Sequence, residues 1–162
     1  LRWKSSNPEK IPKLQPVMTP DCIFSQEHIE LLGLISEGRM FRIHKARRGT
    51  KYIILKSAVH KDAMTTEFLR REYELGNTLS HSCIVTTLGF EEDTPVGPAL
   101  ILEYLEGVSL EEYIATHPTD SATDRIIDDI LDGTDYLHHR GVLHNDIKPS
   151  NIVVNPHGAP VS

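Results

Sequence analysis

The stretch H-N-D-I-K-P-S-N, residues 144–151, decides the fold that we expect for this chain. Its polar side chains can do acid–base, electrostatic and metal-binding work, and its proline stiffens the backbone. Asp146 can accept a proton, Lys148 can neutralise a developing negative charge, and Asn151 offers an oxygen to a hard cation such as Mg²⁺. Phosphoryl transfer needs that combination, because its catalysis depends mostly on positioning and charge neutralisation.

The same stretch resembles the catalytic loop of protein kinases, H-R-D-L-x-x-x-N. His144, Asp146 and Asn151 stand at the matching spacing, and Lys148 followed by proline is similar to the serine/threonine version of the loop. Asn145 departs from the pattern, which usually has Arg there. The resemblance implies that Asp146 and Lys148 are catalytic and that Asn151 binds the metal. Taken alone, eight such residues could also form a polar turn before a strand.

Composition narrows the classes of function that the chain can have. Its 162 residues carry a net charge of −6 without a basic stripe, which argues against a nucleic-acid partner. Cys22 and Cys83 are far apart and lack metal-ligand spacing, so we expect a reduced, cytoplasmic environment. No apolar run is long enough to span a membrane. Because the chain starts at Leu1 rather than Met, we interpret it as part of a longer protein.

Hydrophobic periodicity predicts five strands and one helix in the first two thirds of the chain. Residues 1–27 contain four prolines and no sustained period, so they are interpreted as an extension or linker. Alternating apolar runs separated by turn residues predict an antiparallel meander, and helical spacing follows it. The expected strands cover 28–35, 41–46, 51–56, 84–91 and 99–104, and the helix covers 61–80.

The first turn of the meander aligns with the glycine-rich loop of kinases, G-x-G-x-x-G-x-V. Only Gly38 is retained, since Ser36 and Phe41 replace the other two glycines and Ile43 replaces the valine. Glycines let backbone N–H groups approach phosphates, and Phe41 cannot imitate that. Taken alone, this turn is an ordinary hairpin. The resemblance implies nucleotide contacts from Ile35, Gly38 and Ile43.

A lysine and a glutamate strengthen the resemblance. Lys56 ends the apolar run 52–55, at the place of the kinase strand lysine that pairs the α- and β-phosphates, and Ile54 two residues earlier should narrow the adenine slot. Glu72 lies on the apolar stripe of the expected helix, and a carboxylate there needs a cation. Lys56 is the obvious partner. The alternatives are a solvated lysine and a glutamate at the stripe's edge. The stripe consists of Met64, Phe68, Leu75 and Leu79.

The second half resembles the hinge and the first part of the kinase large lobe. The resemblance places Leu102 behind the adenine, the backbone of Glu103 and Leu105 at its edge, and Val153 beneath it. Ser109 is the expected N-cap of a short helix, and residues 121–139 form a longer one. The apolar face of the longer helix comprises Ile126, Ile127, Ile130, Leu131, Thr134 and Leu137, and five aspartates cover its other face.

The expected fold is therefore α+β and protein kinase-like: a five-stranded antiparallel small lobe with its αC helix, plus the first helices and catalytic loop of a truncated helical large lobe. The expected boundaries are 28–104 for the small lobe and 105–162 for the hinge and large lobe. In the kinase pattern, the magnesium-binding D-F-G should follow within about three residues after Ser162, going by its spacing from Asn151.

The resemblance implies ATP- and Mg²⁺-dependent phosphoryl transfer to Ser/Thr hydroxyls of a protein substrate that the sequence does not identify. The alternative is a pseudokinase or regulatory binding module, suggested by the degenerate glycine-rich loop. We do not expect this piece alone to be active. The apolar face at 126–137 leads us to expect that it self-associates or needs further large-lobe helices.

Overall fold

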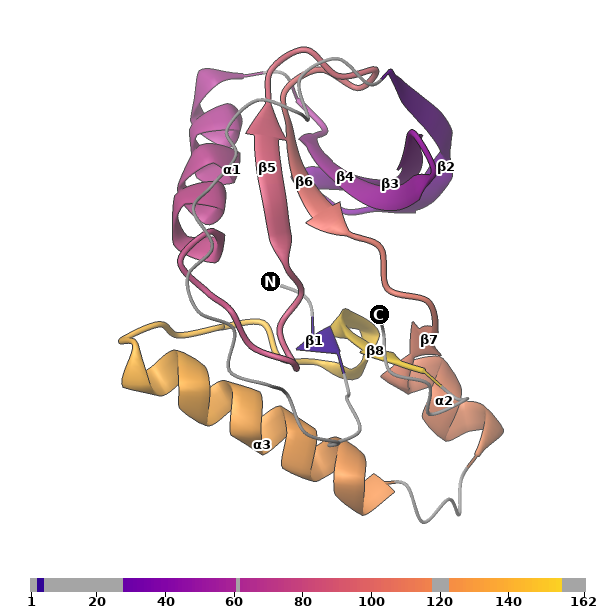
Figure 1. The fold of residues 1–162 in the computed structure, drawn as a ribbon, viewed down its shortest axis with the longest axis vertical. Coiled ribbons are helices and arrows are strands. Elements are labelled where there is room, and N and C mark those ends of the chain that lie inside the picture. Colours follow the sequence, from indigo (N-terminus) through magenta and orange to yellow (C-terminus); the bar gives the residue numbers. More distant parts are fainter. Residues whose placement is uncertain (1–2, 5–27, 61, 118–122, 156–162) are drawn as a thin grey trace.

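The computed structural model describes residues 3–4, 28–60, 62–117 and 123–155 (Figure 1). Most of the expected extension at 1–27 lies outside this range, as does the end of the expected large-lobe segment, residues 156–162.

Five antiparallel strands form the larger sheet, as predicted. They run in the order β2-β3-β4-β6-β5 and curl strongly (Figure 1). The strand predicted from residue 84 begins three residues later. Cys83, Ile84 and Val85 are buried, but they lie in the turn and irregular segment before the strand, and regular pairing starts only at Thr87. The strands are β2 (Ile29–Glu37), β3 (Phe41–Arg48), β4 (Lys51–Ala58), β5 (Thr87–Glu91) and β6 (Ala99–Glu103).

The two faces of this sheet bury different side chains. On one face, Ala46 lies opposite Ile53, and Leu55 lies opposite Ile101, inside the curl. Side chains alternate along a strand, so Ile54 points to the other face, where it packs with Leu69 of the neighbouring helix. Lys56 follows Ile54 by two residues and therefore shares this second face.

Helix α1 (Ala63–Gly76) packs on the second face, and Asp62 caps it by accepting the Thr65 N–H at 2.7 Å. It is shorter than the predicted helix over 61–80. The predicted core stripe is also wrong: Met64, Phe68 and Leu75 are 67%, 46% and 39% exposed. The buried positions are Thr65, Leu69 and Gly76, one residue further round the helix. The small residues among them let the helix approach the sheet closely, which hydrophobicity alone does not indicate.

The helical part of the chain lies below the sheet (Figure 1). Ser109 caps the short helix as predicted, accepting the Glu112 N–H at 3.1 Å. The elements are β7 (Val108–Ser109), α2 (Leu110–Thr116), α3 (Thr123–His139), the 3₁₀ turn η1 (Pro149–Asn151) and β8 (Ile152–Val154). Strand β8 pairs with β7 and with β1 (Trp3–Lys4).

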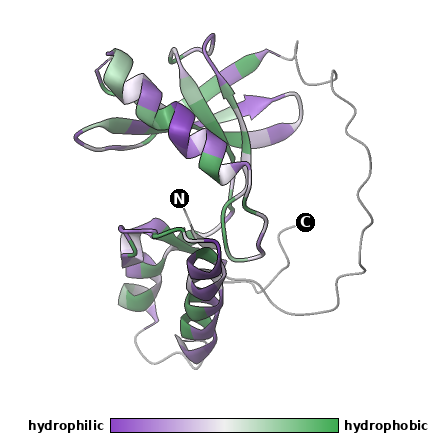
Figure 2. Cartoon of the chain, turned by 90° about the vertical axis from the view of Figure 1, so that its left-hand side faces the viewer, coloured by the Kyte–Doolittle hydropathy of each residue, from purple (hydrophilic) through white to green (hydrophobic). Residues whose placement is uncertain are grey.

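Helix α3 buries part of its predicted apolar face. Ile126 and Leu137 are 4% and 1% exposed, whereas Ile127 and Leu131 are 49% and 61% exposed. With about 100° per residue, Ile127 and Leu131 lie roughly 100–140° from the line through the buried positions. Figure 2 shows that hydrophobic (green) and hydrophilic (purple) positions are mixed along this helix.

Candidate active site

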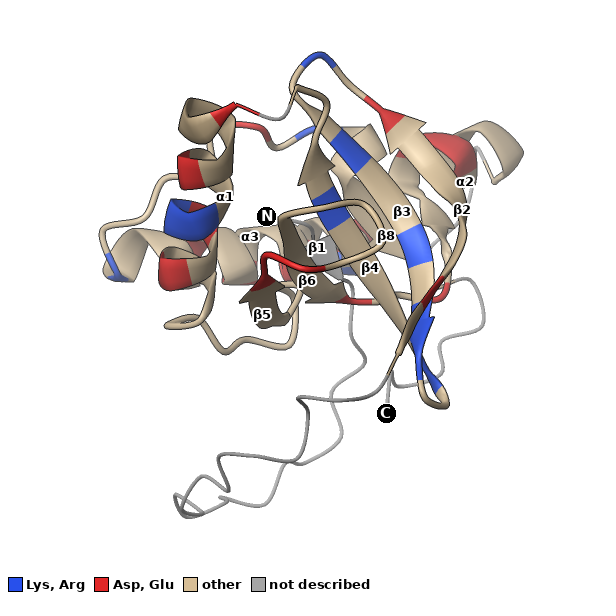
Figure 3. Ribbon diagram, turned by 90° about the horizontal axis from the view of Figure 1, so that it is seen from above, with Lys and Arg blue, Asp and Glu red and all other residues tan. Residues whose placement is uncertain are grey.

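A cleft of about 800 Å³ lies between the sheet and the segment that precedes β8. It is lined from four places: the turn between β2 and β3, strands β3, β4 and β6, helix α1, and residues 143–151. Figure 3 shows basic positions in blue on β3 and β4, and acidic positions in red on α1 beside the sheet. The lining residues are Ser36, Glu37, Gly38, Phe41, Ile43, Ile54, Lys56, Arg71, Glu72, Leu75, Leu102, Leu143, His144, Asp146, Lys148, Ser150 and Asn151.

Lys56 and Glu72 form the ion pair that the sequence led us to expect. The Lys56 Nζ donates to Glu72 Oε2 at 2.6 Å, and the two side chains are only 17% and 23% exposed. Burial by itself raises the pKa of the Glu72 carboxyl, the positive charge of Lys56 acts in the opposite direction, and the net shift is downward. Glu72 is therefore ionised at neutral pH and holds the ammonium at the wall of the cleft.

The polar segment 144–151 turns back on itself, so that its side chains meet. Asn145 has a φ of 58°, a left-handed conformation that Asn tolerates better than most residues. Beyond this bend, Asp146 Oδ1 lies 3.1 Å from Lys148 Nζ, and Asp146 Oδ2 accepts the Asn151 Nδ2–H at 2.7 Å. These hydrogen bonds, from Lys148 first and Asn151 second, lower the pKa of Asp146. The carboxylate therefore remains charged and able to accept a hydrogen bond or a proton.

The orientation of Asn151 suits metal binding. Its amide nitrogen faces Asp146, donating to the carboxylate and, at 3.0 Å, to the Asp146 backbone carbonyl. The amide oxygen therefore points away from Asp146. An amide oxygen is one of the ligands that a hard cation such as Mg²⁺ accepts.

The end of the cleft nearest the turn between β2 and β3 does not present a glycine-lined surface. The N–H of Gly38 donates to the carbonyl of Phe41 at 2.9 Å, so it is used within the turn. The Phe41 ring lies 4.6 Å from Lys56 Nζ. An aromatic side chain thus stands where the resemblance would place the third glycine.

The apolar end contains some of the predicted nucleotide contacts. Ile43, Ile54 and Leu102 line the cleft, and Ile54 and Leu102 are almost fully buried. Leu105 is buried in the cluster behind them, and Val153 packs against that cluster.

Four of the predicted contacts are not among the residues that line the cleft: Ile35, Glu103, Leu105 and Val153. Ile35 is 44% exposed. The Glu103 N–H donates to the Thr86 carbonyl at 3.0 Å.

Several lining residues were not identified from the sequence. Leu75 was assigned to the core stripe of the helix, but it lies one turn after Glu72 and faces the cleft. Arg71, Leu143 and Ser150 also line it. Leu75 could have been found from its three-residue spacing to Glu72. The other three have no comparable signal.

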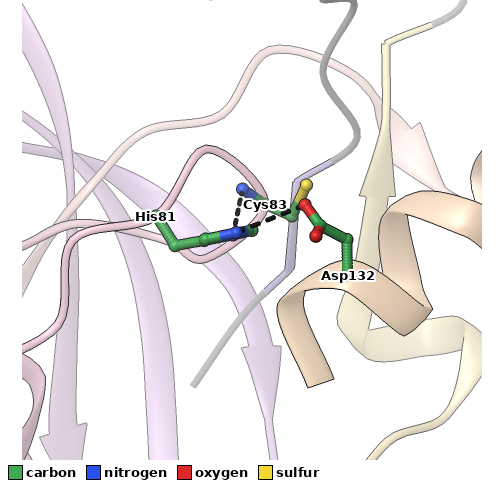
Figure 4. A group of neighbouring side chains, drawn as sticks. All are labelled: His81, Cys83 and Asp132. Atoms are coloured by element: carbon green, nitrogen blue, oxygen red, sulfur yellow. Dashed lines mark hydrogen bonds and ion pairs between the residues drawn. The ribbon is translucent and has the colours of Figure 1, made fainter. Parts of the chain in front are cut away.

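A second polar cluster joins the loop after α1 to α3 (Figure 4). His81, Cys83 and Asp132 bring possible metal-ligand atoms within 4.8 Å of one another. However, His81 Nδ1 accepts the Cys83 N–H at 3.2 Å, so a neutral ring carries its proton on Nε2, which faces Asp132 Oδ2 at 3.3 Å. A metal would need the lone pair of that nitrogen. The contacts therefore fit a hydrogen-bonded link between the sheet and helical parts.

Comparison with known proteins agrees with this geometry. The family model described as the protein kinase domain matches residues 27–161. This chain belongs to the protein kinase family, and the predicted kinase-like fold is confirmed.

Individual kinases are similar at low identity. The serine/threonine-protein kinase PknB of Mycobacterium tuberculosis is 28% identical over 139 residues, covering 80% of this chain and 22% of PknB. The tyrosine-protein kinase SPK-1 of Girardia tigrina is 30% identical over 145 residues, covering 86% of this chain and 29% of SPK-1. The MAP kinase kinase MKK1/SSP32 of Saccharomyces cerevisiae is 28% identical over 144 residues, covering 82% of this chain and 28% of that protein. The chain thus spans less than a third of the length of these relatives. None of the helices within the described residues is both long and apolar enough to cross a membrane.

Proposed function

We propose that this chain contributes the nucleotide cleft and catalytic loop of a protein kinase that transfers the γ-phosphoryl group of ATP to a hydroxyl of a protein substrate. One observation carries the proposal. The Lys56–Glu72 pair and the Asp146–Asn151 pair, which are far apart in sequence, line the same cleft.

Each group has a role in this reaction that its surroundings support. Asp146 is held ionised and orients the substrate hydroxyl or accepts its proton, while Lys148 beside it neutralises charge on the transferred phosphoryl group. Lys56, fixed by Glu72, binds the phosphates of the nucleotide. Asn151, with its amide oxygen directed away from Asp146, would hold Mg²⁺, which when bound neutralises phosphate charge.

At the apolar end, we assign the adenine to the surface formed by Ile43, Ile54 and Leu102, with the backbone of Glu103 and Leu105 at its edge. Val153, the proposed contact beneath the adenine, packs against the same cluster. Ile35 and Gly38 complete the proposed nucleotide contacts, and they belong to the part of the site that departs most from the kinase pattern.

Ser/Thr hydroxyls are the proposed acceptors because Lys148 is followed by Pro149, as in the serine/threonine version of the loop. The names of PknB and MKK1/SSP32 agree with a protein kinase, while SPK-1 is named a tyrosine-protein kinase. Measuring phosphorylation of peptides that contain Ser, Thr or Tyr would show directly which hydroxyl is the acceptor.

A pseudokinase or regulatory binding module is the second candidate, because Ser36 and Phe41 replace glycines of the loop. Against it, the four polar groups that phosphoryl transfer needs, Lys56, Glu72, Asp146 and Asn151, are all present and in mutual contact as two pairs. The named relatives are kinases as well. We therefore favour the enzyme.

Binding of Mg-ATP tests the proposal. We expect Mg-ATP to raise the thermal unfolding temperature of the wild-type chain and to have little effect on Lys56→Met, which lacks the ammonium. Lys56→Met also removes the part-buried ion pair between Lys56 and Glu72, so the ligand-free variant should lose about 1–3 kcal/mol of stability. Arg70→Met, which removes an exposed ion pair with Glu92, is the matched control. If Mg-ATP raised the unfolding temperature of neither the wild-type chain nor Arg70→Met, the result would contradict the proposal and favour a binding module.

Two further properties belong to the proposal. The exposed side chains of Ile127 and Leu131 on α3 support self-association of the 162-residue chain, or its completion by further large-lobe helices. A cytoplasmic location is consistent with the use of ATP, and fractionation of cells that express the protein would test it.

A further inference from the structure

The ammonium of Lys56 is enclosed on two sides. Glu72 Oε2 lies 2.6 Å from Nζ, and the centre of the Phe41 ring lies 4.6 Å from the same nitrogen. Only 17% of the lysine side chain is exposed. A cation over an aromatic face is attracted by the negative potential of the ring. Phe41 and Glu72 therefore both stabilise the positive charge of Lys56 when no ligand is bound.

The turn between β2 and β3 holds Phe41 in this place. Its carbonyl accepts the Gly38 N–H at 2.9 Å, and an ion pair between Glu37 and Arg42 closes the turn at 2.8 Å. The Phe41 ring also packs against the buried cluster that contains Ile54. The backbone hydrogen bond and the ion pair therefore support the turn, and packing against the cluster supports the ring.

Phe41 and Lys56 line the same cleft, and the ring covers one side of the ammonium, so a phosphate that binds the ammonium from that side must displace the ring. We propose that Phe41 is a gate over Lys56, and that the nucleotide phosphates reach the ammonium only after the ring has turned aside. This inference rests on the proposed ATP site. Phe41 is then a positioning residue: it weakens the binding of nucleotides whose phosphates must reach Lys56 and leaves the binding of the nucleoside unchanged.

The gate acts only on ligands that carry phosphate. Adenosine fills the apolar end of the cleft without reaching Lys56, so its binding leaves the ring in place. ATP must replace the contact between ring and ammonium. A cation–π contact of ordinary strength corresponds to about two- to thirtyfold in a binding constant. The ratio of ATP affinity to adenosine affinity is therefore the quantity that Phe41 controls.

Calorimetric titration of the 162-residue chain with Mg-ATP and, separately, with adenosine tests the gate. We expect Phe41→Ala to bind Mg-ATP about five- to tenfold more tightly than wild type, with adenosine affinity changed by less than about twofold. Phe41→Leu keeps much of the apolar volume without an aromatic face and should show the same direction if the alanine variant folds poorly. Phe41→Tyr keeps the ring and should behave as wild type.

Met40→Ala is the matched control, since Met40 is the adjacent large apolar residue, is 40% exposed and does not line the cleft. It should leave both affinities unchanged. NMR gives a direct readout of the ring: the ε-methylene protons of Lys56 should be shifted upfield by the ring current in wild type and Phe41→Tyr. That shift should disappear in Phe41→Leu and when ATP binds to the wild type.

The possible outcomes test the gate separately from the proposed ATP site. Tighter ATP binding in Phe41→Ala or Phe41→Leu with unchanged adenosine binding supports the gate. Unchanged or weaker ATP binding in both folded variants overturns it, while the ATP site stands. If no variant binds either ligand, the proposed nucleotide site itself is wrong and the gate falls with it.

Discussion

His44 illustrates at the residue scale how burial changes an ionisable side chain. It is 9% exposed within the sheet, and its Nδ1 is buried with no hydrogen-bond partner among the described residues. Burial lowers the pKa of the imidazole, the positive charge of Arg42 lowers it further, and Glu37 acts in the opposite direction. The neutral ring is therefore the form that the folded chain prefers.

This lowered pKa predicts that acid destabilises the fold through His44. The unfolded chain titrates this residue near the ordinary value of 6.5, whereas the folded chain takes up the proton only at lower pH. Protons thus bind preferentially to the unfolded chain as the pH falls through 6.5, and stability declines until the folded pKa is passed. The free energy of unfolding, measured by urea denaturation between pH 7.5 and 5, should fall less steeply in His44→Leu than in wild type.

His60→Gln is the control for this experiment, because His60 is exposed in the loop after β4. It should retain the pH dependence of the wild type. Equal slopes in wild type and His44→Leu would show that the buried imidazole does not contribute to acid sensitivity.

At the element scale, the connection between β6 and β7 depends on close approach of two backbones. Gly107 has a φ of 155°, which side-chain-bearing residues rarely adopt. A Cβ at this position would lie 2.4 Å from the Val154 carbonyl oxygen and 3.0 Å from Val153 Cγ1. Because β8 supplies both contacts and directly follows Asn151, this glycine helps to place the segment 144–151 against the connection that leads out of the sheet.

We therefore expect Gly107→Ala to cost about 1–3 kcal/mol of stability, since the obstructing atom belongs to the backbone and has little freedom to move. Chemical denaturation monitored by circular dichroism gives the measurement. Gly33→Ala in β2 is the matched control, because no heavy atom lies within 4 Å of its added Cβ. Similar losses in the two variants would mean that the contact with β8 is unimportant.

At the scale of the whole molecule, the exposed apolar surface of α3 determines whether chains associate with one another. Ile127 and Leu131 are one helical turn apart and largely exposed, although the rest of the predicted apolar face is partly or fully buried. On the side of α3 that faces the sheet, Asp132 contacts His81 of the loop after α1, and the His81 ring lies 4.6 Å from the ring of Tyr136. One side of α3 therefore joins the two parts of the chain, while another side presents apolar surface.

We expect the chain to self-associate through this exposed surface, with an average mass that rises with concentration in light scattering. Burial of a leucine or isoleucine side chain contributes about 1.5–3 kcal/mol, so Ile127→Glu with Leu131→Glu should raise the dissociation constant by more than about tenfold. Met64→Glu, at an exposed apolar position on α1, should have no comparable effect. A monomeric mass at every concentration would contradict the expectation.

The sequence alone determined the features that depend on local pattern and spacing: the five strands, the capped short helix and the order of the polar motifs. Alternation and motif spacing are properties of consecutive residues, so they can be recognised without coordinates. The later start of β5, the buried face of α1 and the exposure of Ile127 were decided by tertiary packing, because burial depends on which distant element covers each side chain. The position of the Phe41 ring over Lys56 was decided in the same way, since strand pairing brings together side chains that lie fifteen positions apart along the chain.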